Sequence, residues 1–268
     1  MTRGAGPWLA AISLVATSFL ALPVLMLVAR AFLGGGLADA LSSDAVIDAL
    51  VLSAATTTIT LLVVLIFGTP LAVFLATSNG RGKVLLETAV DLPIVLPPSV
   101  AGLALLLVFG SRGVVGSWFD SVGLTIPFTT FAVVLAQVFV SAPFFVRAAR
   151  AGFTAVDQDL QDAARVDGAA ESHVFRWITV PLAAPALAAG MVTTWARALG
   201  EFGATIMFAG AIQGVTQTLP LVVYGEFQSS DLEASIAAAT ILILAAALAL
   251  LLVRSTRWGT ALDARAGA

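Results

Sequence analysis

Six long apolar runs alternate with short polar connections along this chain. The runs cover residues 8–32, 50–76, 92–109, 128–146, 178–205 and 236–253. A helix needs about 20 apolar residues to cross a bilayer core about 30 Å thick. The apolar residues are continuous rather than alternating, which argues against a β-barrel. The pattern therefore predicts an all-α integral membrane protein, with six transmembrane helices in one domain over residues 1–268.

Two of the runs contain features that disturb a simple helix. The fifth continues to about Ile212. Unbroken, it would be about 50 Å long at about 1.5 Å per residue, which exceeds the bilayer, so we expect a break or a protrusion near Gly200–Gly210. The third carries Pro93, Pro97 and Pro98 near its start. Because proline removes a backbone donor, this run is either a helix that starts late after an extended segment or a broken helix lining a pathway.

The composition agrees with a membrane protein and removes several functions. The 268 residues are 59% hydrophobic and 11% charged, against about 25% charged in a soluble domain. Without Cys and with one His, His173, the chain has no disulfide, thiol nucleophile or predicted metal site. A net charge of −3 with scattered basic residues argues against nucleic-acid binding. Ala38-Asp39-Ala40, after the first run, resembles the cleavage site of a secretion signal. The run is much longer than the apolar core of a signal peptide, so we do not expect cleavage.

The basic residues predict the orientation. Basic residues concentrate on the cytoplasmic side of membrane proteins. With the amino terminus inside, only Arg30 and Arg112 face outward, and Arg197 lies within the fifth run. The other ten of the 13 face inward: Arg3, Arg81, Lys83, Arg147, Arg150, Arg165, Arg176, Arg254, Arg257 and Arg265. We therefore expect a multi-pass protein of the cytoplasmic membrane with both termini, and segment 150–178, in the cytoplasm.

Segment 150–178 is the most polar part of the chain. Val156, Leu160, Ala163 and Ala164 recur at helical spacing among acidic neighbours, which predicts a short amphipathic helix. Such helices often only lie on the membrane surface, so periodicity alone does not distinguish this segment from an ordinary loop.

A turn and a second short helix are predicted next. Gly168 stands where a helix ends in a left-handed residue. The second helix would have Glu171 near its amino end, where a negative charge is favoured, and would continue through Val174. Pro181 would then open the fifth membrane helix, where its missing N–H is not needed.

The spacing of this segment resembles the EAA loop of ABC-importer permeases. That pattern is Glu-Ala-Ala, three residues, Gly, nine residues, Ile, one residue, Leu-Pro. Asp162-Ala163-Ala164, Gly168, Ile178 and Val180-Pro181 keep every spacing, with Asp replacing Glu and Val replacing Leu. Residues 92–106, 114–130 and 195–210 are also similar to molybdate and sulfate permeases. The stretch GEFGATIMFAG within the last of these fits the molybdate type better.

The resemblance implies a type I ABC importer permease fold and an outside source of energy. Two cytoplasmic ATPase subunits would bind ATP and Mg and dock on the segment, so this chain would have no cofactor of its own. Independently, Lys83 in NGRGKV lacks the following Ser or Thr of a phosphate-binding loop. The residues expected to couple to the ATPase are Asp162, Ala163, Ala164, Gly168, Glu171 and Val174.

The resemblance also implies further partners. A separate extracytoplasmic oxyanion-binding protein would deliver the substrate. A second permease copy would complete the pore, identical to the first in the molybdate type and usually a distinct protein in the sulfate type. The sequence leaves these two arrangements open.

Residues of a translocation pathway or gate are harder to predict. Arg197 and Glu201 are four apart on one helical face. Ionisable groups within an apolar run are functional candidates, although the two could instead form a structural pair. The flanking Gly200 and Gly203 could let helices approach or bend. The remaining candidates are the prolines Pro97 and Pro98 and the hydroxyl or amide donors Ser99, Gln137, Thr193, Thr194 and Thr205.

The predicted function is the membrane permease subunit of an ATP-driven molybdate importer. Within the class, sulfate, thiosulfate and tungstate are alternative substrates. An ion-coupled secondary transporter is more remote, because no internal repeat is evident. An intramembrane enzyme lacks the Cys, His and metal motifs that it would need.

Overall fold

A computed structural model describes residues 7–255, with side chains described over residues 8–251. All regular structure in this range is helical. Arg3, Arg257 and Arg265, which contribute to the expected orientation, lie outside the described residues, as does the side chain of Arg254. The elements in chain order are α1 (Pro7–Gly34), α2 (Gly36–Ser42), α3 (Asp44–Thr77), α4 (Arg81–Val95), α5 (Pro98–Phe109), α6 (Gly116–Ser121), α7 (Thr130–Thr154), α8 (Gln158–Val166), α9 (Glu171–Val174), the π-helical turn η1 (Phe175–Thr179), α10 (Val180–Leu199), α11 (Gly203–Phe208), α12 (Leu219–Gln228) and α13 (Leu232–Ser255).

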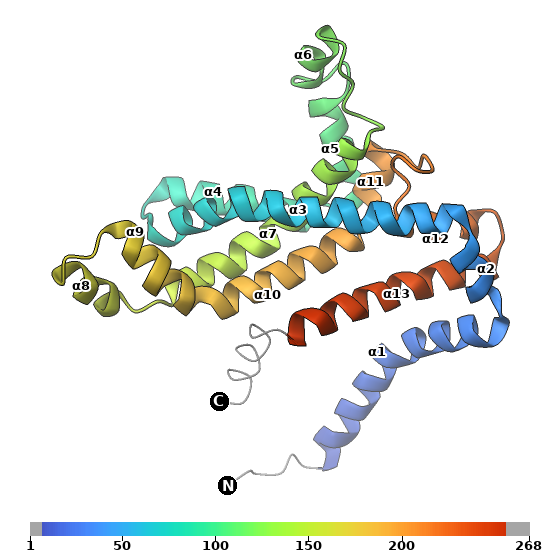
Figure 1. Cartoon of the computed structure of the whole chain (residues 1–268), viewed down its shortest axis with the longest axis horizontal. Helices are drawn as coiled ribbons and strands as arrows, with labels where there is room; N and C mark the ends of the chain where they lie inside the picture. The colour runs from blue at the N-terminus through green and yellow to red at the C-terminus, as the bar shows by residue number, and fades with distance from the viewer. Residues whose placement is uncertain (1–6, 256–268) are drawn as a thin grey trace.

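Five helices of the described part are long and apolar enough to cross a membrane. They are α1, α3, α7, the continuous helix Glu171–Leu199 and α13. The bent pair α4 and α5 makes a sixth candidate span if it is counted as one. Figure 1 shows α3, α7, α10 and α13 running along the long axis of the molecule, with α5 and α6 standing out to one side.

Small residues let α3, α7 and α10 pack closely at the centre of the molecule. A Cβ at Gly68 of α3 would lie 3.1 Å from Phe145 Cδ1 of α7, and one at Gly190 of α10 would lie 3.0 Å from Ala148 Cβ. Phe145 is itself 1% exposed. Lipid is as apolar as these side chains, so close packing rather than the hydrophobic effect holds membrane helices together.

Buried hydroxyl and amide groups fix the register of α3 against its neighbours. Gln137 of α7 is 1% exposed; its amide donates to Thr56 Oγ1 at 3.2 Å and accepts from Thr60 Oγ1 at 3.0 Å. The Ser53 hydroxyl accepts from the Leu219 backbone N–H at 2.9 Å. Because these partners engage both ends of the Gln137 amide, it is an interhelical tie within the chain.

The third span is a broken helix, the second of the two interpretations of its prolines, and the first interpretation is wrong. The helix does not begin late: α4 starts at Arg81, contains Pro93, and ends at Val95 before an extended Leu96. α5 then begins at Pro98 and runs at 119° to α4. A proline disfavours the helical conformation of the residue that precedes it. Because Pro97 and Pro98 are consecutive, both Leu96 and Pro97 are restricted in this way. α5 alone has 12 residues, about 18 Å, which is too short to cross the bilayer.

The fifth span begins earlier and ends earlier than expected. Its helix starts at Glu171 and is continuous to Leu199, so Pro181 does not open it. In η1 the Val180 N–H bonds to the Phe175 carbonyl, five residues back, so the hydrogen-bond ladder is already shifted beside Pro181, and the missing donor of the proline is accommodated there. The predicted break is confirmed: the helix ends at Gly200, and α11 starts anew at Gly203.

Candidate functional site

The segment between α7 and α10 has the predicted form of helix, glycine turn and helix. The Asp157 side chain caps α8 by accepting from the Asp159 N–H at 3.0 Å. At the other end Gly168 has φ +88°. The Gly168 N–H bonds to the Arg165 carbonyl and the Ala169 N–H to the Ala164 carbonyl, each at 3.0 Å. This pair of bonds is the Schellman motif that ends helices at a left-handed glycine.

α8 lies at one end of the molecule, next to α9 (Figure 1). None of its residues is buried. Its apolar side chains face outward: Leu160 is 51% and Val166 is 87% exposed. A helix with an apolar stripe normally buries that stripe against something. This stripe is unpaired within the described chain, so it is available to a partner.

Arg165 joins the two short helices across the glycine turn. Its Nε and Nη2 donate to the two carboxylate oxygens of Glu171 at 2.7 and 3.1 Å, and its Nη1 donates to Asp162 Oδ1 at 2.6 Å. The hydrogen bonds with Glu171 and then Asp162 raise the pKa of Arg165 above its ordinary value, because they favour the charged guanidinium. We refer to this cluster of Arg165, Glu171 and Asp162 as the Arg165 clamp.

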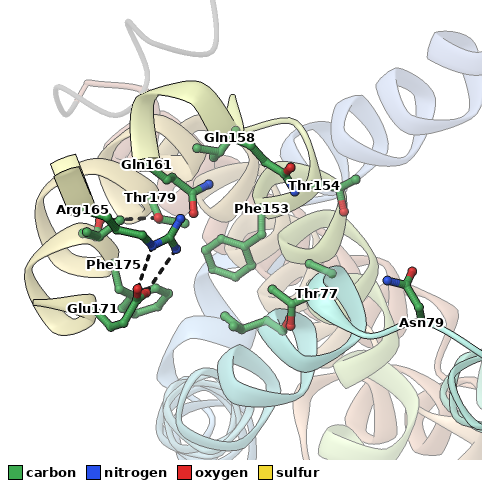
Figure 2. A pocket seen from close by; sticks show the side chains of 14 residues that line it. Thr77, Asn79, Phe153, Thr154, Gln158, Gln161, Arg165, Glu171, Phe175 and Thr179 are labelled. Carbon is green, nitrogen blue, oxygen red and sulfur yellow. Dashed lines mark hydrogen bonds and ion pairs between the residues drawn. The ribbon is translucent and has the colours of Figure 1, made fainter. Parts of the chain in front are cut away.

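A pocket of about 380 Å³ separates this segment from the ends of α3 and α7. Figure 2 shows Thr77, Asn79 and Phe153 on the side of the long helices, facing the Arg165–Glu171 pair across the opening. Within segment 150–178, which we call the coupling segment, α8 is therefore not packed directly against α3 and α7 along this face.

The residues expected to couple to an ATPase fall into two groups. Asp162, Ala163, Gly168 and Glu171 are exposed, and Ala164 is half-buried. Val174 is only 2% exposed and lines the pocket, so this placement gives it an internal role instead of the expected contact. Arg165 was missed as a site residue; the sequence signal was its i, i+3 spacing from Asp162, which brings side chains together on a helix.

The break after α10 brings several expected pathway residues together. Glu201 is 1% exposed, and its Oε2 lies 2.7 Å from Arg197 Nη1. No donor within the described side chains meets hydrogen-bond geometry at that oxygen, so the contact is an ion pair by distance. Glu201 Oε1 accepts from the Ala204 N–H at 2.7 Å. One buried carboxylate thus neutralises Arg197 and caps the first turn of α11, as the structural interpretation of the pair expects.

The start of α5 lies against the start of α11. A Cβ at Gly203 would meet Pro98 and come within 3.3 Å of the Ser99 backbone nitrogen. Pro97, Pro98 and Ser99 are exposed at the α4–α5 break, whereas Gly200 caps the end of α10. This geometry joins two helix breaks, one from the third span and one from the fifth.

The expected hydroxyl donors lie in different surroundings. Thr194 is buried, and its hydroxyl is 3.4 Å from the Ser141 carbonyl oxygen. Thr193 is exposed and donates within its own helix to the Ala189 carbonyl at 2.7 Å. Thr205 is buried in α11, and its hydroxyl has no hydrogen-bond partner among the described residues. Of these three threonines, Thr205 is the one whose hydroxyl remains free, within the described chain, to hydrogen-bond with another molecule.

Charged residues also connect α4 to α7. Arg150 pairs with Glu87, and Arg147 Nε lies 3.7 Å from Asp91 Oδ1. Both arginines are within α7 rather than in a connecting loop. These two pairs attach α4, of which only Pro93 is buried, to α7, whereas Lys83, 3.8 Å from Glu87, forms an i, i+4 pair within α4 itself.

Two solved bacterial ABC transporters share this arrangement of helices. A bacterial ABC transporter that imports the acidic polysaccharide alginate matches 92% of this chain and 92% of its own, with a TM-score of 0.69 and 19% identity. A bacterial alginate ABC transporter in complex with its pentasaccharide-bound periplasmic protein matches 92% of this chain and 93% of its own, with a TM-score of 0.71 and 19% identity. The described chain therefore has the type I fold of an ABC importer permease.

The sequence itself gives the family. Residues 68–266 match the family described as binding-protein-dependent transport system inner membrane component, and the chain belongs to this family. It is 41% identical to a probable transport system permease protein, NifC, of Clostridium pasteurianum over 78% of this chain and 73% of NifC. It is 39% identical to the molybdenum transport system permease protein ModB of Escherichia coli (strain K12) over 79% of this chain and 92% of ModB. The protein is thus a multi-pass membrane component of a transport system.

Proposed function

We propose that this chain is the permease subunit of an ATP-driven importer of molybdate. The observation that carries the substrate is the similarity to molybdenum transport permeases over about four-fifths of the chain. Sulfate, thiosulfate and tungstate are the alternatives, because they are oxyanions of the same charge and similar shape. The remote alternative is an ion-coupled secondary transporter, which would move its substrate without an ATPase.

Energy enters, on this proposal, through α8. The helix is amphipathic, wholly unburied and placed at one end of the molecule (Figure 1), as a docking element must be. Two separate ATPase subunits would hold ATP and Mg and grip Asp162, Ala163, Ala164 and Gly168, with Glu171 at the margin. Small side chains at 163, 164 and 168 permit close approach of the partner. This chain would supply no ATPase site.

The orientation follows from the basic residues and from this docking. Both termini and α8 would face the cytoplasm, and α2, α6 and α12 would face outward. Two copies of the chain would enclose the pore, and an extracytoplasmic oxyanion-binding protein would dock on the outer face. That protein would provide selectivity, because a pathway built from Ser99, Thr205 and the backbone at the Pro97–Pro98 and Gly200–Gly203 breaks offers only weak, neutral donors to a doubly charged anion.

Transport by the reconstituted complex tests the proposal. The permease, its ATPase and its binding protein are placed in proteoliposomes, and uptake of labelled molybdate is measured with and without internal ATP. We expect ATP-dependent uptake that tungstate inhibits more strongly than sulfate does. Preferred uptake of sulfate would contradict the substrate, and uptake without the ATPase would contradict the energy source.

A further inference from the structure

We propose that Arg165 is a positioning residue that makes the two short helices of the coupling segment move as one body. Through the Arg165 clamp, motion of α8 would be delivered to the helix Glu171–Leu199. This inference rests on the proposed docking of an ATPase on α8, and it concerns what happens after docking.

The first step is that α8 has little else to hold it. None of its residues is buried, and its packing neighbours are α9 and η1. The pocket of about 380 Å³ separates it from the ends of α3 and α7 (Figure 2). A push on α8 therefore reaches the rest of the chain mainly through α9 and η1, not through α3 and α7 along this face.

The second step concerns the two chain connections of α8. On the α7 side, Val156 in the connection is 7% exposed and belongs to the core, so that end is anchored. On the α9 side the connection is the turn at Gly168, whose Cβ-free backbone has open space around it. Glycine gives a backbone the most conformational freedom, so this turn alone would bend and absorb motion.

The third step is that Arg165 spans this turn. Its planar fork grips both oxygens of Glu171, the first residue of α9, while a third nitrogen holds Asp162 one turn back on α8. Single exposed ion pairs contribute little to stability, but bidentate geometry and shared networks are the exceptions. The clamp therefore restrains the angle between α8 and α9 without being needed for the fold.

The fourth step is where the motion goes. Glu171 begins a helix that continues unbroken to Leu199, about 44 Å at about 1.5 Å per residue. It ends at the break that holds Glu201, Gly203 and the start of α5. A rotation imposed on α8 and carried by the clamp would thus reach the expected pathway at the far end of this helix.

The test uses the complete transporter and measures docking, ATP hydrolysis and uptake separately. For Arg165→Ala we expect normal co-purification of the ATPase and continued hydrolysis. Uptake per ATP should fall about five-fold or more, the lower end of couplings between linked sites. Arg165→Lys should recover only part of the lost uptake per ATP, because an ammonium cannot form the planar fork.

The matched control is Arg176→Ala, which removes the same charge from η1. Arg176 stacks on Trp177 and does not bridge the turn, so uptake by this variant should match wild type.

Chemical rescue separates a clamp from a direct contact with the partner. The chain has no Cys, so Arg165→Cys with Glu171→Cys can be bridged by a short bis-methanethiosulfonate, which forms one disulfide with each thiolate and releases two methanesulfinate ions, using an ATPase without accessible thiols. Bridging should restore uptake per ATP, and its failure to do so would overturn the clamp. Normal coupling in Arg165→Ala, or loss of ATPase binding in that variant, would also overturn it. If the wild-type chain binds no ATPase at all, the proposed function fails first, and the two failures remain distinguishable.

Discussion

The two ends of the helix Glu171–Leu199 each carry an arginine–glutamate pair in opposite surroundings. At the start, Arg165 and Glu171 have side chains 38% and 75% exposed. At the end, Arg197 is 28% exposed and Glu201 only 1%. If one member of the first pair is removed, water can solvate the charge that remains. Water cannot reach the buried Glu201 carboxylate in the same way. The same chemistry should therefore set mobility at one end and stability at the other, and the following variants test that contrast.

Removing Arg197 should have the largest effect on stability. Arg197→Ala leaves the Glu201 carboxylate buried without its cation, and breaking one side of a buried pair costs about 3–5 kcal/mol. Thermal unfolding in detergent measures this. Arg197→Met with Glu201→Gln should recover most of the loss, because a glutamine oxygen can still accept from the Ala204 N–H.

A matched control is Arg30→Ala, which breaks the pair Arg30–Glu233, with side chains 60% and 46% exposed. It should cost less than about 1 kcal/mol. Equal unfolding midpoints for Arg197→Ala and Arg30→Ala would contradict the buried pair. If the double variant is stable but does not transport, the pair has a pathway role as well as a structural one.

The helices could be predicted from the apolar runs, but several ends could not. Apolar run length and the Gly200–Gly210 region were sufficient to expect a long fifth helix with a break. Its start was misplaced because Pro181 is a reliable signal for the first turn of a helix, and no sequence pattern announced the π turn beside it. Likewise, Pro97 and Pro98 predicted a break in the third span but not the helix α4 before it.

The candidate site was predictable where local geometry decides it. Gly168 ends α8 because a left-handed residue is needed there, and the sequence shows this directly. The bond from Arg165 to Glu171 crosses a turn, so its existence depends on how two helices are set in space. The burial of Val174 and Gln137 likewise depends on neighbours from distant parts of the chain.

The body of the helix should resist added volume. In Gly190→Val, the first added carbon already lies 3.0 Å from Ala148 Cβ and 3.4 Å from Phe145 Cα. We expect a loss of about 1–3 kcal/mol from overpacking, measured as a lower unfolding midpoint. Gly82→Val is the control, since a Cβ there meets nothing within 4 Å. A midpoint for Gly190→Val as high as that of the control would show that α10 is free to move away from α7.

The exposed end should respond to strain at its turn. Gly168 has φ +88° and open space, so Gly168→Ala adds backbone strain of about 1–2 kcal/mol without a clash. Because α8 buries nothing, the strain should reshape the turn and lower uptake per ATP while the unfolding midpoint of the spans stays unchanged. Gly168→Pro, which also removes the N–H bonded to Arg165, should uncouple transport more completely.

Gly123→Ala is the control for that strain. Gly123 follows α6, has φ +79° and is equally unobstructed, but it lies outside the coupling segment. It should transport normally. A similar loss of uptake in both variants would mean that strain itself, rather than its position at the coupling turn, impairs the protein.

The smallest effect on stability should come from Glu171→Gln. The amide keeps the size of the side chain but loses the charge that holds the guanidinium, while Arg165 retains Asp162. We expect an unfolding midpoint equal to that of wild type and a loss of uptake per ATP smaller than in Arg165→Ala. Added salt, which screens exposed charges, should lower coupling in the wild type and change it less in this variant. A drop in the unfolding midpoint comparable to that of Arg197→Ala would erase the distinction between the two ends, because the exposed pair would then be holding the fold.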